Sequence, residues 1–311
     1  MTKIGVTDKS STEQPKYIRY VSLAPISTIY FKYPAVRERA AQIANKTVNK
    51  DTVIKNWFAN LALQIHGEIE TERIKRLGQT KQFKTGRFYN LHFWSGFSIL
   101  PTALLLADSP NPAFQSTARK LFIQSNNVFT DAMFEIEFNR DEAGNGFLVR
   151  ELQRRRLALN YHAYASYPIL GMATLSQAYK CDFTSTSWKK KQISRLIKKT
   201  LGGYYNPTIF ANEMSNNPAQ YPGVTAILPE ALYRVDNSRL LYLSDTVLPS
   251  NDIRSFLATV TSTPFPIGYG MNQSYSQMGG NLTTLVNTVS TLKSKPLPAA
   301  FEGLCAPLTK S

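Results

Sequence analysis

Apolar positions recur at helical spacing along much of the chain. The clearest stripe follows Asp51, a candidate helix cap, and contains Val53, Ile54, Trp57, Phe58, Leu61 and Ile65. Apolar or periodic stretches at residues 98–107, 113–137 and 227–243 also predict helices. Alternating helices of roughly 10–20 residues favour an all-α fold built from antiparallel helical hairpins.

Other stretches lack this periodicity. We expect a disordered leader at residues 1–16 and a helical domain at residues 17–245. Within that domain, aromatic and β-branched residues with two prolines predict an extended segment or loop at 17–34 that packs on the body of the domain. Asn, Tyr, Pro and Gly predict a long loop at 202–222. Residues 246–311 are rich in Ser, Thr and Pro, and we expect this C-terminal segment to be packed on the domain or partly disordered.

The charge balance favours polyanionic partners. The 311 residues include 36 Lys plus Arg against 21 Asp plus Glu, a formal net charge of +15. Nucleic acid, anionic polysaccharide and anionic lipid all fit this charge, and so does a basic protein with no such partner. The basic stretches 71–87 and 188–199 are not interleaved with aromatic residues, so a nucleic-acid partner is not favoured, and a solvated helix face is the simpler explanation of 188–199.

Three further features narrow the class of protein. The longest apolar run, residues 97–107, is too short to span a bilayer, so we expect no transmembrane segment. Residues 1–16 contain no apolar core typical of a signal peptide. The two cysteines, Cys181 and Cys305, have no CxxC or histidine neighbour, which argues against a metal site and leaves a single disulfide open.

The densest group of reactive side chains lies at residues 146–164, and the pattern predicts that most of this stretch is one helix. Glu151 precedes Arg154 by three residues, which suits a local ion pair. Arg154 and Tyr161 are seven residues apart, so on one helix they would leave the same face roughly 10 Å apart. A cation beside a phenol favours the phenolate and lowers the pKa of the tyrosine, which is what a tyrosine base requires.

A second stretch, residues 89–100, combines one of only three histidines with aromatic side chains. His92 lies among Phe88, Tyr89, Phe93, Trp94 and Phe97. A histidine in such surroundings suits the wall of a cleft for a ring-shaped ligand.

Together the two stretches resemble the alginate lyases, a family of toroidal α/α polysaccharide lyases that cut poly-mannuronate. That family carries Asn-Asn-His followed by Tyr-Trp, and later Gly-Phe-Leu-x-x-Glu-Leu-x-Arg, Ala-Leu and Tyr-His-x-Tyr-Ala. The matching residues here are Asn90-Leu91-His92-Phe93-Trp94, Gly146-Phe147-Leu148, Glu151-Leu152-Gln153-Arg154, Ala158-Leu159 and Tyr161-His162-Ala163-Tyr164-Ala165. Leu91 departs from the family pattern, because the family has an asparagine at the position directly before the histidine. The N-terminal part is also shorter than in the family, and residues 246–311 have no family counterpart.

The resemblance implies an incomplete (α/α) toroid and cleavage of mannuronate-rich alginate, or another polyuronate, by β-elimination. Arg154 would pair with the substrate carboxylate, Tyr161 would act as base, acid or both, and His92 would be a partner base or would polarise the carboxylate. The implied substrate-binding residues are Asn90, Trp94, Lys32, Arg155, Tyr164 and Arg87. This chemistry needs no metal or redox cofactor. The resemblance also implies a secreted or periplasmic protein. The alternative is a weakened or inactive relative that binds anionic polysaccharide, and the loss of the asparagine at Leu91 supports it.

Overall fold

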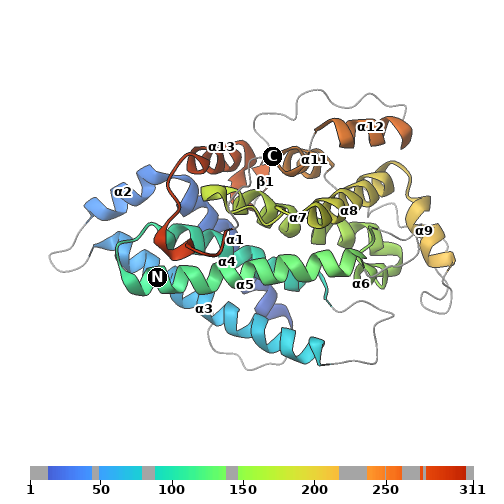
Figure 1. Cartoon of the computed structure of the whole chain (residues 1–311). Coiled ribbons are helices and arrows are strands. Elements are labelled where there is room, and N and C mark those ends of the chain that lie inside the picture. Colours follow the sequence, from blue (N-terminus) through green and yellow to red (C-terminus); the bar gives the residue numbers. More distant parts are fainter. Residues whose placement is uncertain are drawn as a thin grey trace.

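The computed structural model describes residues 13–43, 49–78, 88–137, 146–216, 237–248, 250–260, 274–275 and 278–305. Nearly all of this part of the chain is helical (Figure 1), which confirms the all-α prediction. The α-helices are α1 (Glu13–Lys32), α2 (Pro34–Gln42), α3 (Lys50–Leu77), α4 (Asn90–Ala107), α5 (Pro112–Glu137), α6 (Val149–Leu152), α7 (Ala158–Ser176), α8 (Ser187–Tyr205), α9 (Thr208–Ser215), α11 (Asn237–Val247), α12 (Ser250–Val260) and α13 (Leu282–Lys293). Short 3-10 turns are η2 (Arg155–Leu157), η3 (Ala178–Lys180) and η5 (Ala299–Phe301), and the strands β1 (Ser274–Tyr275) and β2 (Gly280–Asn281) pair antiparallel.

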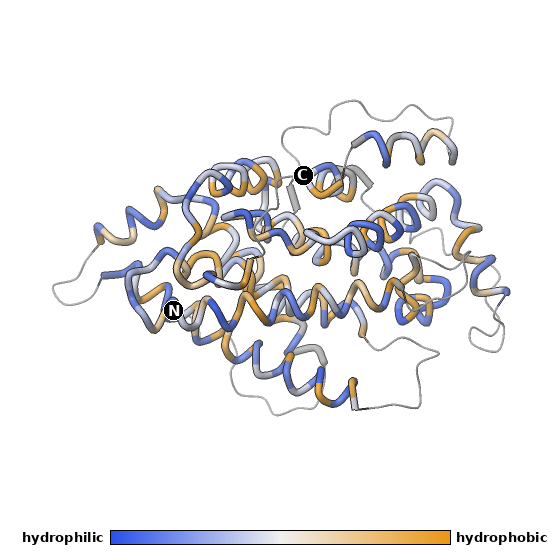
Figure 2. The backbone as a smooth tube through the Cα atoms, in the orientation of Figure 1, coloured by the Kyte–Doolittle hydropathy of each residue, from blue (hydrophilic) through white to orange (hydrophobic). Residues whose placement is uncertain are grey.

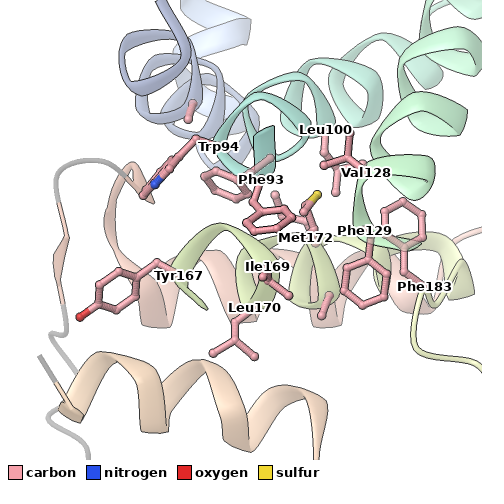
Figure 3. Close-up of a cluster of buried hydrophobic side chains, with 14 of the residues drawn as sticks. Phe93, Trp94, Leu100, Val128, Phe129, Tyr167, Ile169, Leu170, Met172 and Phe183 are labelled. Atoms are coloured by element: carbon pink, nitrogen blue, oxygen red, sulfur yellow. The ribbon is translucent and has the colours of Figure 1, made fainter. Parts of the chain in front are cut away.

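Helix α4 lies at the centre of the molecule. It packs against α1, α3, α5 and α7, and every residue of the helix except Leu91 is buried. Burial on all sides explains why most positions of this helix are apolar. The hydroxyl groups of its Ser95 and Ser98 donate to backbone carbonyls of the preceding turn. Phe93, Trp94 and Leu100 of α4 meet side chains of α5 and α7 in the main core (Figure 3). The outer helices instead carry mixed hydrophobic and hydrophilic positions (Figure 2).

Helices that follow one another in the chain also pack together. This holds for α2 with α3, α3 with α4, α4 with α5, α7 with α8, and α11 with α12. Such pairing is what helical hairpins require. Closure of the hairpins into a toroid stays a prediction. In the described part of the chain, no helix is both long and apolar enough to cross a lipid bilayer.

The N-terminal segment differs from the prediction. Helix α1 (Glu13–Lys32) begins inside the expected leader and covers residues 17–32 of the stretch 17–34, which we predicted to be an extended segment or loop. Its residues Tyr20, Leu23 and Ala24 are buried at helical spacing, so packing against α4 outweighs the β-propensity of its aromatic and β-branched residues. The rest of the expected leader, residues 1–12, lies outside the described residues.

The C-terminal segment takes part in the core. Helix α13 packs against α1, α7 and η3, and its residues Leu282, Leu285 and Val289 are buried. Phe301 is also buried, with its ring centroid 4.3 Å from that of Phe122. The open question about the cysteines is answered by a Cys181–Cys305 disulfide, which joins the end of η3 to the chain just after η5.

Two other stretches can be compared with their predictions. The expected loop at 202–222 is partly helical, because α8 continues to Tyr205 and α9 covers Thr208–Ser215, while 217–222 lie outside the described residues. The basic stretch 188–199 is an amphipathic helix, as predicted. Its Ile193, Leu196 and Ile197 are buried, and Lys190 and Lys191 are exposed.

Candidate active site

The stretch 146–164 is not one helix. It is divided into α6, η2 and α7, and Arg155 at the break has a φ of 53°, in the left-handed region. The prediction that Arg154 and Tyr161 share one helix face is therefore wrong. The break nevertheless brings the two side chains together, because the guanidinium carbon of Arg154 lies 4.6 Å from the ring centroid of Tyr161. Arg154 is exposed and Tyr161 is partly exposed, so this pair is accessible from solvent.

Arg154 is connected to the beginning of α4 through a buried carboxyl group. The backbone N–H of Asn90 donates to Glu151 Oε1 at 2.6 Å, and Asn90 Nδ2 lies 3.1 Å from both carboxyl oxygens. Arg154 Nε lies 3.9 Å from Glu151 Oε2, which gives the predicted ion pair. Glu151 has no exposed surface and Asn90 is buried. In this arrangement Asn90 holds Glu151, and Glu151 in turn anchors Arg154.

Burial raises the pKa of Glu151 to about 7, against the hydrogen bonds from Asn90 and the charges of Arg154 and Arg150, which lower it. Because the folded pKa lies above the ordinary value of 4.5, this group stabilises the fold below about pH 4.5, and its contribution is lost as the pH rises through 7. We expect Glu151→Gln to remove that dependence. Between about pH 4 and about pH 8, the free energy of unfolding of the parent should fall by about 3 kcal/mol more than that of the variant. Urea unfolding at both pH values measures the difference, and parallel pH profiles would contradict it.

His92 faces a different neighbour from Asn90. Its Nε2 lies 2.9 Å from Oδ2 of Asp131 on α5, and Phe88 stacks on its ring with centroids 4.1 Å apart. Arg73 on α3 donates to the same carboxyl group, from Nε to Oδ2 at 2.7 Å and from Nη2 to Oδ1 at 3.1 Å. His92 is buried, and burial lowers its pKa while the hydrogen bond to Asp131 opposes that shift. At neutral pH the imidazole is therefore neutral.

The two motif stretches meet at a second point. The rings of Trp94 and Tyr164 lie 5.1 Å apart, between α4 and α7. Trp94 has no exposed surface, whereas Tyr164 is partly exposed. The central location of α4 places the indole of Trp94 in the core (Figure 3), and contact of Trp94 with substrate stays a prediction. Trp94 supports the ring of Tyr164 from inside.

Two hollows share Tyr89 as a lining residue, and we call them together the Tyr89 site. One has a volume of about 240 Å³ and is lined by Tyr89, Arg150, Gln153 and Arg154. The other, of about 230 Å³, is lined by Lys16, Tyr20, Glu68, Ile69, Glu72, Lys75, Arg76, Tyr89, Leu91, His92 and Ser95. The Tyr89 site therefore runs from Arg154 to His92.

The Tyr89 site carries an excess of cations. The guanidinium carbons of Arg76 and Arg150 lie 5.2 and 6.0 Å from the ring centroid of Tyr89. The carboxylates in the second hollow are already paired, because Glu68 binds Arg19 and Glu72 binds Arg76. Positive charge in excess of the carboxylates, beside an aromatic ring, suits an anionic sugar polymer.

The remaining predicted residues are placed differently. Arg155 is exposed at the left-handed turn beside Arg154, and Arg87 lies outside the described residues. Lys32 is buried at the end of α1, where its Nζ donates to the carbonyl oxygens of Gly279 and Asn281, the latter at 3.2 Å. Burial lowers the pKa of Lys32 to about 8. Lys32 thus holds the C-terminal segment, and its contact with substrate stays a prediction.

Sequence reasoning named Tyr89 only as one of the aromatic residues of an expected cleft wall, and it singled out neither Arg76 nor Arg150. Tyr89 stands directly before Asn90, and Arg76 lies in the basic stretch 71–87 that precedes the histidine motif. Their closeness in sequence to the histidine motif could have marked Tyr89 and Arg76 as candidate site residues. Their approach to one ring, however, depends on the packing of α3 against α4, which no local pattern encodes.

Part of the longer motif is structural. His162 is fully buried: its Nε2 accepts from the backbone N–H of Leu148 at 2.9 Å, and its Nδ1 lies 2.9 Å from Oγ1 of Thr200. Thr200 Oγ1 also donates to the carbonyl of Leu196 at 2.9 Å, so Nδ1 of His162 carries the proton. Burial lowers the pKa of His162 to about 3. This neutral histidine joins α7, α8 and the residues before α6.

Gly146 at the start of the motif cannot be replaced without strain. Its φ is 111°, and an added Cβ would lie 2.6 Å from the carbonyl oxygen of Arg195. We expect Gly146→Ala to lower the free energy of unfolding by about 2–4 kcal/mol, because the backbone and the neighbouring helix must both shift. Gly67→Ala is the matched control, since Gly67 lies inside α3 with nothing within 4 Å of its added Cβ. That change should stabilise the protein by about 0.5–1 kcal/mol, and equal effects of both variants in urea unfolding would contradict the expectation.

Comparison with known proteins agrees with the motifs. The alginate lyase family model matches residues 35–210, more than half of the chain. An alginate lyase of Pseudomonas syringae pv. syringae is 24% identical over 196 residues, which are 63% of this chain and 43% of that protein. An alginate lyase of Pseudomonas aeruginosa (strain LESB58) is 26% identical over 190 residues, 60% of this chain and 42% of that protein. The matches thus span less than half the length of these relatives. With the family match over residues 35–210, and with the Asn90–His92 and Gly146–Tyr164 motifs joined in one site, the chain belongs to the alginate lyase family.

Proposed function

We propose that this protein is a polysaccharide lyase that cleaves mannuronate-rich alginate by β-elimination and leaves an unsaturated uronate end. The observation that carries the proposal is the placement of the Arg154 guanidinium over the Tyr161 ring at 4.6 Å, at the edge of a cationic hollow. The alginate lyases that the chain resembles support the substrate class. The Cys181–Cys305 disulfide suits an oxidising compartment, which supports a secreted or periplasmic location.

The reaction requires three tasks of the protein. The carboxylate at C5 is neutralised so that the electron pair left by the C5 proton can delocalise into it, a base removes that proton, and an acid protonates the glycosidic oxygen as its bond to C4 breaks. Arg154 suits the first task because a guanidinium binds a carboxylate through two parallel hydrogen bonds. Tyr161, held next to that cation, suits proton transfer, and His92 is a second proton acceptor at the other end of the Tyr89 site.

Arg154→Lys tests the role of the guanidinium. Lysine keeps the charge but loses the two-pronged contact, so we expect kcat/KM to fall by roughly 100-fold. Arg156→Lys is the matched control, since Arg156 is an exposed arginine of the same run. Initial rates of product formation on poly-mannuronate measure both variants. Equal rates for Arg154→Lys and the parent would show that charge alone is sufficient.

The direct test of the function is the ultraviolet absorbance of the unsaturated uronate product. The parent protein should give a rise with poly-mannuronate and a smaller one with poly-guluronate or glucuronan. A greater rate on either of the latter would move the substrate assignment to that polymer. No rise on any of the three would refute the lyase proposal for these substrates.

A specific observation favours a second candidate, a binding relative without activity. Leu91, where the family has an asparagine, lines the same hollow as His92 and brings an apolar side chain where an amide would help to neutralise a carboxylate. Retained affinity for alginate in a pull-down, without any absorbance rise, would establish this candidate. Asn90 does not substitute for the missing amide, because its side chain is engaged with Glu151.

A further inference from the structure

Two charged groups that the mechanism above does not use, Arg73 and Asp131, lie in a cluster with His92. Arg73, Asp131 and His92 come from α3, α5 and α4 and form a continuous chain of hydrogen bonds. Asp131 is 6% exposed and the side chain of His92 is 2% exposed, whereas Arg73 reaches the surface. Placing a carboxylate in the interior is costly, and here both an arginine and an imidazole bind it.

We propose that Asp131, held in place by Arg73, is a positioning residue that fixes His92 as the Nε2–H tautomer and so leaves Nδ1 as its proton-accepting nitrogen. The role of this nitrogen in cleavage rests on the proposed lyase function. The tautomer itself does not, and it can be measured without substrate.

The geometry determines which nitrogen carries the proton. Both oxygens of the Asp131 carboxylate accept hydrogen bonds from Arg73, and a carboxylate has no proton of its own to donate. The 2.9 Å contact with Oδ2 therefore requires a proton on His92 Nε2. Since the neutral ring holds one proton, Nδ1 has a free electron pair.

The surroundings of His92 keep this state in place. Phe88 stacks on the ring with planes 17° apart, which restricts its rotation. The charged groups that act on it are Asp131, Arg73 and Glu72, and Glu72 is itself paired with Arg76. His92 also lines the second hollow of the Tyr89 site together with Leu91 and Ser95. A base with a defined tautomer at this wall is what proton transfer to or from a bound sugar requires.

The tautomer can be read from the nitrogen chemical shifts of the three histidines, His66, His92 and His162, in the full-length protein. His162 provides an internal reference, because its contacts require the opposite tautomer with the proton on Nδ1. Each histidine is assigned by comparison with its His→Gln variant. We expect Nε2–H for His92 and Nδ1–H for His162 at neutral pH. An Nδ1–H tautomer for His92 in the parent would overturn the proposal, whatever the enzymatic activity.

Two variants connect the tautomer to cleavage. Asp131→Leu keeps a similar shape but removes the acceptor, so His92 should show a mixture of tautomers and kcat should fall by roughly 100-fold with little change in KM. Asp131→Asn can present either its oxygen or its amide to His92, and activity should follow the tautomer that is observed. Full activity with the reversed tautomer, or lost activity with the original one, would refute the positioning role.

Asp108→Asn is the control for the loss of a hydrogen-bonded carboxylate that does not contact His92. Asp108 accepts a hydrogen bond from Tyr179. This variant should leave both the tautomer of His92 and kcat unchanged. Thermal melts identify any variant that fails to fold. If the parent shows the expected tautomer but cleaves none of the polyuronates, the proposed function fails while the assignment of the tautomer stands.

Discussion

Tyr161→Phe is expected to lower kcat for uronate elimination by roughly 10²–10⁴-fold, the range that a positioned acid or base contributes. The change removes one hydroxyl group and leaves the ring on which the Arg154 guanidinium rests. Binding of the polymer should therefore change little, because the cation–ring contact and the basic residues of the Tyr89 site remain. The absorbance of the unsaturated product gives kcat, and the affinity for alginate is measured separately by calorimetry.

Tyr204→Phe is the matched control for this substitution. Tyr204 is also partly exposed, but its ring packs edge-on against Tyr205 on α8 and no cation lies over it in the described structure. This variant should cleave at the parental rate. If Tyr161→Phe also retained the parental rate, Tyr161 would be a packing residue, and the proton transfers would have to be assigned to His92 and a bound water.

The motif spacing predicted Arg154 and Tyr161 on the same side of one helix, but it did not predict their direct contact. Two helical turns would separate the side chains by roughly 10 Å along one axis. The observed contact instead depends on the left-handed turn at Arg155, a conformation that a non-glycine residue rarely adopts and that no periodicity reveals. The ion pair of Arg154 with Glu151 was predictable, because it depends only on local spacing.

Burial was harder to predict than secondary structure. The aromatic character of residues 89–100 suggested a cleft wall, yet Trp94 is wholly buried while Tyr89 lines both hollows. Which side of a mostly apolar helix faces a ligand depends on the helices that pack around it, and α4 packs against four others. Asp131 could not be linked to His92 from the sequence for the same reason, because the two lie on different helices and 39 residues apart.

Replacing Cys305 with alanine is expected to lower the free energy of unfolding by about 2–4 kcal/mol. The disulfide joins Cys181 and Cys305 across a sequence separation of 124, so in the unfolded chain it closes a long loop and reduces conformational entropy. The native contacts at this end do not depend on the bond. Phe301 remains packed on Phe122, and Arg119 Nη1 still donates to the carbonyl of Glu302 at 2.8 Å. The loss should therefore appear as a lower urea midpoint with an unchanged native circular-dichroism spectrum.

The parent protein treated with a reducing agent provides the matched comparison for Cys305→Ala. Both samples lack the cross-link, so their urea midpoints should agree, and the reducing agent should have no effect on the variant. The variant should also retain alginate cleavage at the parental rate. The cross-link lies just after η3 and η5, whereas the Tyr89 site is formed by α1, α3, α4 and the residues around α6. If the oxidised parent and Cys305→Ala unfolded at the same urea concentration, the buried contacts of Phe301 and α13 would be sufficient to hold the C-terminal segment without the disulfide.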